Sequence, residues 1–302
     1  MTASKSRLSA CYSIEDLRRH AKKRLPWGIW EFLEGGSDDE WSVRNNRAAF
    51  DHYELVPRSL VDVSETALST RVMGLDLSWP VMLAPTGMTR MYHGDGEKAV
   101  ARAAAAAGTL YSLSTFSSHS IEEVAQVCSG PKMFQLFINP GWERSLALVS
   151  RAQEADYDAL CLTVDSAVPP NKERDYRTGI DPGRITFRNL ASILGHPRWL
   201  YGVLRHGPPR LANLDAGALE ATDIRWKDAS RLTWDRVEEI RRLWRGPFAL
   251  KGMLNADDAR RAAQLGVDAL ILSNHGGRQM DCLPAPVDWV APMKDAVGDQ
   301  ID

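Results

Sequence analysis

From residue 80 onward the chain repeats one unit, in which a short apolar run is followed by a polar turn and an amphipathic helix. Continuous apolar runs with little alternation are typical of parallel strands buried on both faces. Helix signals lie between the runs, including a capping box at residues 120–123 and Asn255 followed by two aspartates. This alternation predicts a parallel α/β fold. The runs are residues 80–86, 110–116, 133–138, 159–165, 248–251 and 269–275.

The six units do not complete a closed barrel. The sixth helix is expected at residues 287–297, close to the last residue, Asp302. A parallel barrel needs eight strands to leave no edge exposed. Two interpretations stay open from the residues: an open doubly wound sheet, or a (β/α)8 barrel with two units missing. We expect an N-terminal helical extension at 1–79 and a β/α domain at 80–302, with an insertion at 166–232 after the fourth run.

Charge and cysteine usage narrow the class of protein. A net charge of −2 leaves no excess of cations to neutralise phosphates, so we expect no nucleic-acid partner. No apolar run approaches the roughly 20 residues that cross a bilayer, and the N-terminus lacks the apolar core of a secretory signal. The four cysteines are widely spaced, which favours free thiols in a reducing compartment. We expect a cytoplasmic protein without a bound metal ion.

Polar residues stand at the ends of three successive apolar runs. Asp165 ends the fourth run, Lys251 the fifth and His275 the sixth. In a barrel the carboxyl ends of all strands face one mouth, where active sites are built. A carboxylate there can orient an imidazole and stabilise its protonated form. A single strand-end lysine or histidine is usually only solvated, but three at equivalent positions favour a general-base site.

The loop after the sixth run adds an anion-binding candidate. Gly276 and Gly277 allow a sharp turn and a close approach of ligand to backbone. Arg278 supplies a planar fork that suits a carboxylate. On the residues alone, a hydroxy-acid site and a plain loop with an exposed cation are equally good interpretations.

The motif at residues 273–279, Ser-Asn-His-Gly-Gly-Arg-Gln, resembles the FMN-dependent 2-hydroxy-acid dehydrogenase and oxidase family, which includes glycolate oxidase, lactate oxidases and mandelate dehydrogenase. The resemblance runs from about residue 12 to the end of the chain. Residues 196–199 and 205–213 are most similar to the mandelate dehydrogenase branch. The resemblance implies a (β/α)8 TIM barrel that binds FMN in the 80–302 domain. Further segments that carry it are residues 83–88, 134–136, 162–165 and 250–252.

The resemblance also implies roles for the site residues. His275 would take the proton during oxidation of a 2-hydroxy acid to a 2-oxo acid, with Asp165 stabilising the imidazolium. Arg278 would hold the substrate carboxylate, and Lys251 would lie near the flavin N1–C2 carbonyl, where charge gathers on reduction. Gly87 replaces the alanine usual in the oxidases, which favours a quinone or protein electron acceptor over oxygen. The implied cofactor-binding residues are Pro85, Thr86, Gly87, Ser114, Gln135, Thr163, Lys251 and Ser273.

Substrate anchoring departs from the family pattern. One family tyrosine aligns with Trp30 and another with Phe137, and an arginine after the fourth strand aligns with Lys172. Each lost phenolic donor removes a charge-assisted hydrogen bond of roughly 1.5–3 kcal/mol. With Arg278, these three residues are the expected substrate-binding set. We therefore expect a substrate larger than glycolate, lactate or mandelate, or one anchored differently. An alternative is a peptide-derived cofactor precursor, as in mycofactocin maturation.

The family's phosphate-binding motifs on the seventh and eighth strands do not occur before Asp302. We therefore expect a C-terminally truncated chain with poor FMN retention, so a non-catalytic remnant is a third interpretation. A full-length form is expected to be a homo-oligomer. Residues 184–210 are basic and rich in large apolar side chains, which suits peripheral contact with the inner face of a membrane. A loop over the active site or an oligomer contact is the alternative.

Overall fold

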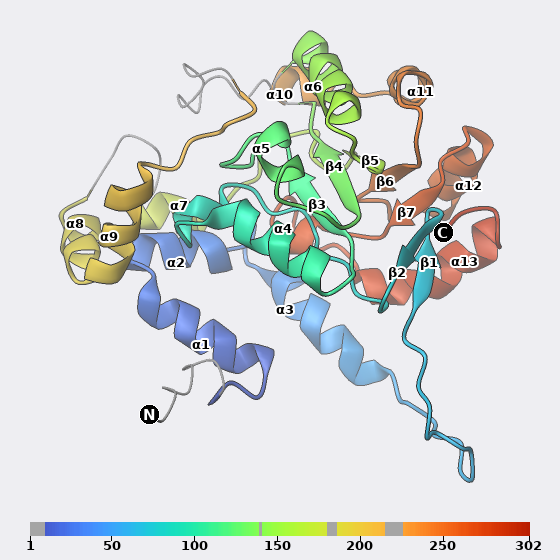
Figure 1. Cartoon of the computed structure of the whole chain (residues 1–302), viewed down its shortest axis with the longest axis horizontal. Coiled ribbons are helices and arrows are strands. Elements are labelled where there is room, and N and C mark those ends of the chain that lie inside the picture. The colour runs from blue at the N-terminus through green and yellow to red at the C-terminus, as the bar shows by residue number, and fades with distance from the viewer. Residues whose placement is uncertain (1–9, 139–140, 180–185, 215–225) are drawn as a thin grey trace.

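The central sheet consists of five parallel strands (Figure 1). The computed structural model describes residues 10–138, 141–179, 186–214 and 226–302. The strands are hydrogen-bonded in chain order, so every crossover runs in the same direction. A doubly wound sheet would reverse its order at a switch point, whereas a barrel does not. The sheet is therefore singly wound. Its strands are β3 (Tyr111–Ser114), β4 (Lys132–Leu136), β5 (Ala159–Thr163), β6 (Phe248–Lys251) and β7 (Ala269–Ile271).

Five of the six predicted strands are confirmed, and the first is not a regular strand. The run at residues 80–86 contributes only an isolated parallel bridge between Leu83 and Tyr111. The prolines at both sides of that bridge, Pro80 and Pro85, have no N–H to donate, so the ladder cannot extend. At the other edge of the sheet, the backbone of Asp302 pairs with β7: its C=O accepts from Leu270 N at 3.0 Å.

Two of the helices that follow the strands begin where the sequence predicts, and a third begins later. Ser120 and Glu123 form the expected capping box, and the Asn255 side chain accepts from the N–H groups of the two aspartates that follow it. The sixth helix begins three residues later than expected because Pro286 opens a 3-10 turn, η6 (Pro286–Trp289). The helices are α4 (Gly96–Ala106), α5 (Ile121–Ala125), α6 (Trp142–Glu154), α11 (Trp234–Leu243), α12 (Ala256–Gln264) and α13 (Val290–Val297).

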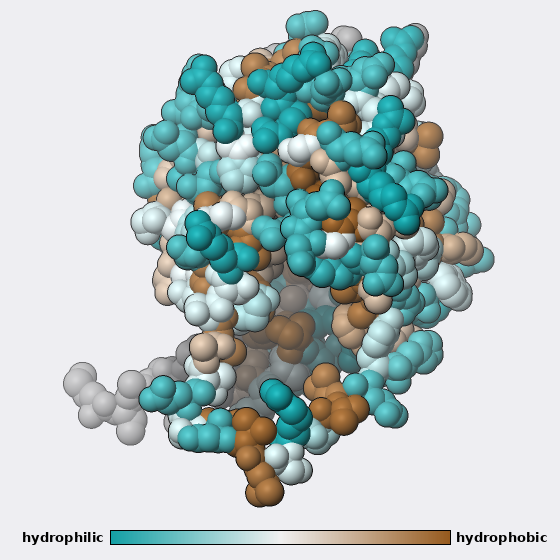
Figure 2. All heavy atoms as spheres, turned by 90° about the vertical axis from the view of Figure 1, so that its right-hand side faces the viewer, coloured by the Kyte–Doolittle hydropathy of each residue, from teal (hydrophilic) through white to brown (hydrophobic). Residues whose placement is uncertain are grey.

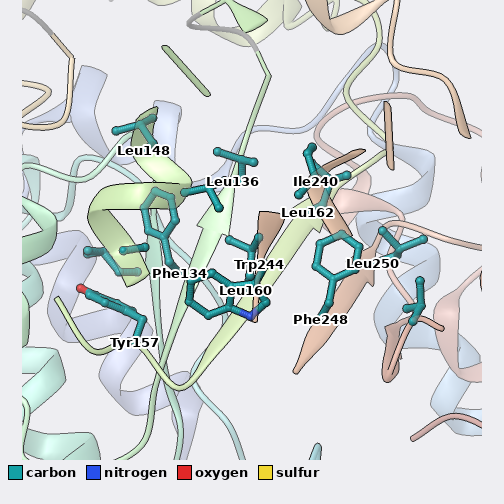
Figure 3. Close-up of a cluster of buried hydrophobic side chains, with 14 of the residues drawn as sticks. Phe134, Leu136, Leu148, Tyr157, Leu160, Leu162, Ile240, Trp244, Phe248 and Leu250 are labelled. Atoms are coloured by element: carbon teal, nitrogen blue, oxygen red, sulfur yellow. The ribbon is translucent and has the colours of Figure 1, made fainter. Parts of the chain in front are cut away.

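The two faces of the sheet carry different side chains because residues alternate along each strand. One face packs against the helices and forms the main core, which includes Phe134, Leu160 and Leu250 (Figure 3). The opposite face begins with small or apolar residues such as Met133 and Cys161. Further along the same face, at the carboxyl ends, come polar residues. The register places Ser114 beside Gln135 and Thr163 beside Lys251. The polar positions therefore gather at one end of one face.

The N-terminal extension is helical, as the sequence predicts, and it also contains a hairpin that the sequence did not predict. The hairpin turns at Met73 and Gly74, both with positive φ, and its Met73 and Leu77 pack against the apolar side of the second sheet face. Residues 53–69 project from the body and expose apolar side chains such as Leu55 and Leu60 (Figure 2). The elements are α1 (Ile14–Arg24), α2 (Trp27–Glu34), α3 (Trp41–Ala48), η2 (Ala49–His52), β1 (Thr70–Val72) and β2 (Leu75–Leu77).

The insertion after β5 folds partly into helices that lie beside α2 (Figure 1). Trp27 at the start of α2 donates its N–H to Ser192 Oγ at 2.7 Å, and the Arg188 guanidinium lies 3.6 Å from the centroid of the Trp27 ring. Within the described part of the chain, no helix is both long and apolar enough to cross a membrane. The helices of the insertion are α7 (Glu173–Thr178), α8 (Phe187–Leu194), α9 (Pro197–His206) and α10 (Trp226–Ala229).

Candidate active site

A cavity of about 630 Å³ opens at the carboxyl ends of the strands. All the predicted site residues line it except two, Asp165 and Trp30. Its walls come from the strand ends, from the loops after them and from α2. The sequence-predicted residues on its walls are Pro85, Thr86, Gly87, Ser114, Gln135, Phe137, Thr163, Lys172, Lys251, Ser273, His275 and Arg278.

His275 and Asp165 form a hydrogen-bonded pair. The His275 Nδ1 lies 2.9 Å from Asp165 Oδ1, and the ring centroid of Phe137 is 5.9 Å from that of the imidazole. Because Nδ1 faces the carboxylate, Nε2 is the nitrogen left for a ligand in the cavity. Asp165 sits behind the histidine, where its second oxygen, Oδ2, is buried without a hydrogen-bond partner. The pair has the arrangement of a general base with an orienting carboxylate.

Gly252 gives the Asp165 carboxylate its space. Its φ is +105°, and a Cβ at this position would lie 2.4 Å from Asp165 Cγ and 2.6 Å from Oδ2. The backbone here cannot easily withdraw, since Gly252 N donates to Ile271 O of β7 at 3.0 Å. The Lys251–Gly252 pair at the end of β6 therefore does two things: the lysine lines the cavity and the glycine makes room for the carboxylate.

The N-terminal extension holds the loop that carries His275. Asn274 is buried and exchanges side-chain hydrogen bonds with Asn46 of α3, at 2.8 and 2.6 Å. The first N–H groups of α3 bind the Asp281 carboxylate, with Ser42 N at 2.7 Å. Gly277 packs so closely on α3 that an added Cβ would lie 2.6 Å from Val43 N. The loop conformation thus depends on a helix more than 200 positions away in the sequence.

One end of the cavity is cationic. The Arg278 guanidinium donates to Phe32 O at 3.0 Å and to Leu33 O at 2.9 Å at the end of α2, and also to Gly35 O. The Lys172 ammonium lies 5.2 Å from the Phe32 ring centroid, and Arg278 lies 5.7 Å from it. Burial, reinforced by the charge of Arg278, lowers the pKa of Lys172 to about 8. Two cations on one apolar wall suit a carboxylate ligand.

The other end is polar and holds a single buried cation. Lys251 is 8% exposed, and its Nζ donates to Ser273 Oγ at 3.3 Å. Gln135 Nε2 donates to Thr163 Oγ1 at 2.6 Å. Within the described residues no carboxylate forms an ion pair with Lys251. This end therefore suits a ligand with carbonyl oxygens and a developing negative charge.

The expectation that Trp30 binds substrate is corrected by its position. Trp30 is 4% exposed and does not line the cavity; instead Arg18 and Lys22 of α1 lie over its ring, at 5.6 and 5.8 Å. Two residues further along α2, roughly 200° around the helix, Phe32 faces the cavity. The cavity walls also contain Leu33, Tyr92 and Leu211, for which no local motif gave a signal. Met88 and Gln279, within the segments that carry the family resemblance, and Phe116, at the end of the second run, line the cavity too, and no role was predicted for them.

The chain is similar to known proteins over most of its length. The FMN-dependent dehydrogenase family matches residues 21–302. A Mycobacterium tuberculosis protein provisionally named L-lactate dehydrogenase is 41% identical over 287 residues, covering 94% of this chain and 69% of the relative. The (S)-mandelate dehydrogenase of Pseudomonas putida is 37% identical over 287 residues, covering 93% and 72%.

Similarity to solved structures extends to the whole architecture. The crystal structure described as monotopic membrane protein (S)-mandelate dehydrogenase superposes with a TM-score of 0.92 at 36% identity, covering 96% of this chain and 79% of that one. The α/β fold, the parallel sheet and the N-terminal helices match in order. The chain therefore belongs to the family of FMN-dependent 2-hydroxy-acid dehydrogenases and oxidases, enzymes built on the TIM barrel.

Proposed function

We propose that this chain oxidises a 2-hydroxy acid to a 2-oxo acid at the cavity described above. The observation that carries the proposal is the convergence of three kinds of group on one cavity: the His275–Asp165 pair, the cations Arg278 and Lys172, and the buried Lys251. A 2-hydroxy acid presents a carboxylate beside the carbon that is oxidised. An anion anchor next to a base therefore matches this substrate class.

The polar end of the cavity fits the ring of FMN. A buried ammonium without a carboxylate partner among the described residues suits a group that gathers negative charge, and Lys251 provides it. Amide and hydroxyl groups of Gln135, Thr163 and Ser114 line the same cavity and can bind ring carbonyls or the ribityl chain. When bound, FMN accepts the two electrons that the substrate loses.

The protein residues perform the remaining work. Arg278 and Lys172 bind the substrate carboxylate and orient the hydroxyl-bearing carbon. His275 takes one proton at Nε2, and the Asp165 carboxylate stabilises the imidazolium that results. The oxidation removes two electrons and two protons from the substrate, and His275 takes one of these protons. Transfer as a hydride and transfer through a carbanion both satisfy this balance.

The residues on the cavity walls favour a class of substrate and a class of electron acceptor. Phe32, Phe116 and Phe137 make the substrate end apolar, so a 2-hydroxy acid with a bulky apolar group is favoured over glycolate. The ring centroids of Phe116 and Phe137 are 5.0 Å apart, which forms a continuous aromatic wall. A peptide-derived hydroxy substrate is the alternative. Gly87 is the basis for proposing a quinone or protein as electron acceptor.

Replacement of the base tests the proposal. With the protein loaded with FMN, (S)-mandelate and a series of larger 2-hydroxy acids are mixed rapidly without oxygen, and loss of flavin absorbance is followed. We expect reduction in the wild type and none in His275→Ala, with substrate binding retained. His93→Ala, an exposed histidine outside the cavity, should reduce normally. Equal reduction in His275→Ala would exclude His275 as the base, and no reduction of wild type by any acid would favour the non-catalytic remnant.

We also propose that the described part of the 184–210 segment contacts a membrane surface. Phe187 is 87% exposed and Leu204 74% exposed, and Leu190, Leu194 and Tyr201 are exposed nearby. The basic residues Arg188 and Arg198 lie among them in the sequence. Apolar side chains beside arginines suit an anionic lipid surface, and the similar mandelate dehydrogenase is described as monotopic.

Vesicle sedimentation tests the membrane contact. We expect the protein to sediment with vesicles that contain phosphatidylglycerol and to lose this binding in the Phe187→Glu, Leu204→Glu double variant. Leu243→Glu, which alters an exposed leucine on α11, is the control and should bind as the wild type does. If the double variant binds equally well, the segment is not the contact surface.

A further inference from the structure

Tyr92 is the one tyrosine among the described residues that line the active-site cavity. It follows η3 (Thr89–Met91), a turn in the connection between Leu83 and α4. Lys172 and Arg278 line the same cavity, and the charge of Arg278 acts on Tyr92. Tyr92 also lines a neighbouring hollow of about 140 Å³.

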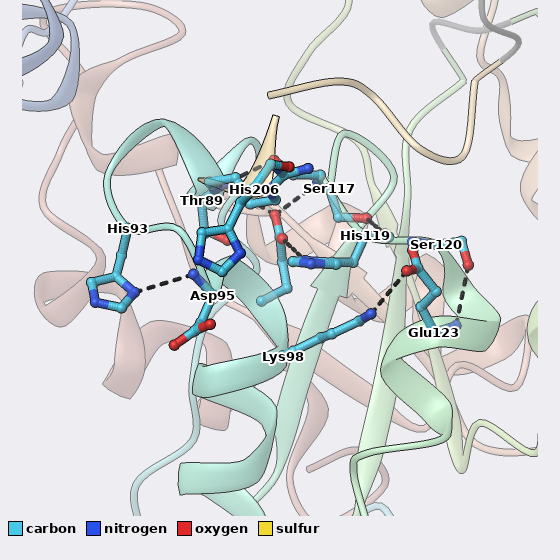
Figure 4. A network of polar contacts seen from close by, with 12 residues as sticks. Thr89, His93, Asp95, Lys98, Ser117, His119, Ser120, Glu123 and His206 are labelled. Carbon is cyan, nitrogen blue, oxygen red and sulfur yellow. Dashed lines mark hydrogen bonds and ion pairs between the residues drawn. The ribbon is translucent and has the colours of Figure 1, made fainter. Parts of the chain in front are cut away.

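The turn that carries Tyr92 is fixed on both sides. On the inner side, the buried Glu97 carboxylate accepts from Thr89 N at 3.0 Å and contacts His119 Nδ1 at 2.8 Å (Figure 4). On the outer side, Trp199 of α9 donates its indole N–H to Met91 O at 2.7 Å. Both hydrogen bonds hold the backbone just before the tyrosine, which limits where its ring can lie, and a pre-organised donor loses little entropy on binding.

The Tyr92 hydroxyl is available as a donor. Among the described residues it has no hydrogen-bond partner, in contrast to Tyr157, whose hydroxyl donates to Ile121 O at 3.0 Å. Burial raises the pKa of Tyr92 to about 12; the positive charge of Arg278 opposes this shift and Asp175 adds to it. The phenol therefore keeps its proton at neutral pH, and the positive charge of Arg278 acts on it.

The substrate end of the cavity is short of fixed donors without Tyr92. Phe32 and Phe137 on its walls offer none. Three hydrogen bonds of Arg278 already go to the backbone carbonyls at the end of α2, which leaves two of its five N–H groups for a ligand. The ammonium of Lys172 adds charge and three donors, but on a flexible stem that does not fix the orientation of a carboxylate. A neutral donor held beside the two cations would fix that orientation.

We propose that the Tyr92 hydroxyl donates a hydrogen bond to the carboxylate of the substrate that Arg278 and Lys172 hold, and so selects for acids in this chain. This inference rests on the proposed function, because it assumes a 2-hydroxy acid in the cavity. The contact makes Tyr92 a substrate-binding residue on a loop for which the sequence predicted no role. The cavity walls carry phenylalanine, which has no hydroxyl, at Phe32 and Phe137. Tyr92 would supply a phenol to the substrate from a different element.

The test compares two probes that differ in the group Tyr92 would contact. Phenylacetate has a carboxylate and no hydroxyl to oxidise, and 2-phenylethanol has no carboxylate. Calorimetry on the FMN-loaded protein should show that Tyr92→Phe weakens phenylacetate binding roughly 10- to 100-fold and leaves 2-phenylethanol binding unchanged. Tyr201→Phe removes an exposed phenol that lines only the neighbouring hollow, and both probes should bind it as they bind the wild type.

The outcomes separate the inference from the proposed function. Equal phenylacetate binding by Tyr92→Phe and wild type would overturn the inference, even if (S)-mandelate reduces the flavin. Equal weakening of both probes would also overturn it, since the effect would then be one of packing. A selective loss of phenylacetate binding supports the carboxylate contact whether or not (S)-mandelate reduces the flavin; absence of reduction by every 2-hydroxy acid would count against the proposed function alone.

Discussion

Replacing Gly252 by alanine should disrupt the His275–Asp165 pair although neither residue of the pair is replaced. The added Cβ would lie 2.4 Å from Asp165 Cγ, whereas two carbon atoms in contact are about 3.5–4.0 Å apart. The backbone of Gly252 is held by its 3.0 Å hydrogen bond to Ile271 O. The carboxylate, with one oxygen unpartnered, is therefore the group that must move, by about 1 Å.

The size of the effect follows from the bond that breaks. Asp165 Oδ1 lies 2.9 Å from His275 Nδ1, and a displacement of about 1 Å takes it beyond hydrogen-bond range. A hydrogen bond to a charged group contributes roughly 1.5–3 kcal/mol, and that stabilisation is needed when the imidazolium forms. The rate of flavin reduction should fall roughly 10- to 150-fold.

A matched glycine separates the clash from backbone strain. Gly266 also has a positive φ, +70°, but an added Cβ would meet nothing within 4 Å. Gly266→Ala should therefore lower the free energy of unfolding by roughly 1–2 kcal/mol and leave the rate of flavin reduction unchanged. Both variants are loaded with FMN, mixed rapidly with (S)-mandelate or the best acid found for the wild type, and melted in parallel.

Two results would refute this reasoning. If Gly252→Ala reduces its flavin at the wild-type rate, the Asp165–His275 contact does not control the proton transfer. If Gly266→Ala slows reduction as much as Gly252→Ala does, the loss comes from general strain and not from the displaced carboxylate. Asp165→Asn, which keeps the shape but removes the charge, should reproduce the slow reduction of Gly252→Ala.

Two further predictions follow from buried charges. Because burial lowers the pKa of Lys172 to about 8, the Michaelis constant for a 2-hydroxy acid should rise as the pH passes about 8, and Lys172→Arg should abolish that rise; the same rise in both proteins would contradict the assignment. Burial raises the pKa of Glu97, but hydrogen bonds from His119 and Ser118 outweigh it and leave the pKa lowered. Glu97 thus stabilises the fold above its ordinary pKa and loses this effect as the pH falls through the lowered value. In Glu97→Gln the free energy of unfolding should therefore depend less on pH in the acid range than it does in the wild type. An unchanged pH dependence would count against the stabilising contact between Glu97 and His119.

Much of the site was predictable because it lies on regular elements. Asp165 and Lys251 come at or just after the carboxyl ends of consecutive parallel strands, which meet at one edge whatever the rest of the chain does. Gln135 and Thr163 were predicted from the family resemblance, and the two-residue period of a strand accounts for their place on the face opposite the helices. These positions depend only on neighbours in the sequence.

Errors arose where a position depends on packing between distant segments. Trp30 and Phe32 are both aromatic residues of one short helix, and only the orientation of α2 against Arg278 decides which of them faces the cavity. The first run, at residues 80–86, was predicted as a strand but forms only one bridge. Its two prolines cannot donate to the hydrogen-bond ladder. Tyr92 has no motif, and its place in the wall follows from contacts of its turn with Glu97 and α9.

The α/β class, the order of strands and helices along the chain, the helix caps and the chemistry of the loop at 273–279 follow from the sequence alone, because each depends on local propensity and short-range pattern. The residues left a doubly wound sheet and a barrel open; the family resemblance predicted the barrel, and the singly wound order of the strands agrees with it. Only the tertiary structure shows that the N-terminal extension holds the loop that carries His275 through Asn46 and Asn274, and that carbonyl groups at the end of α2 accept hydrogen bonds from Arg278. Those features depend on which surfaces meet, and contacts across more than 200 residues leave no periodic signal in the chain.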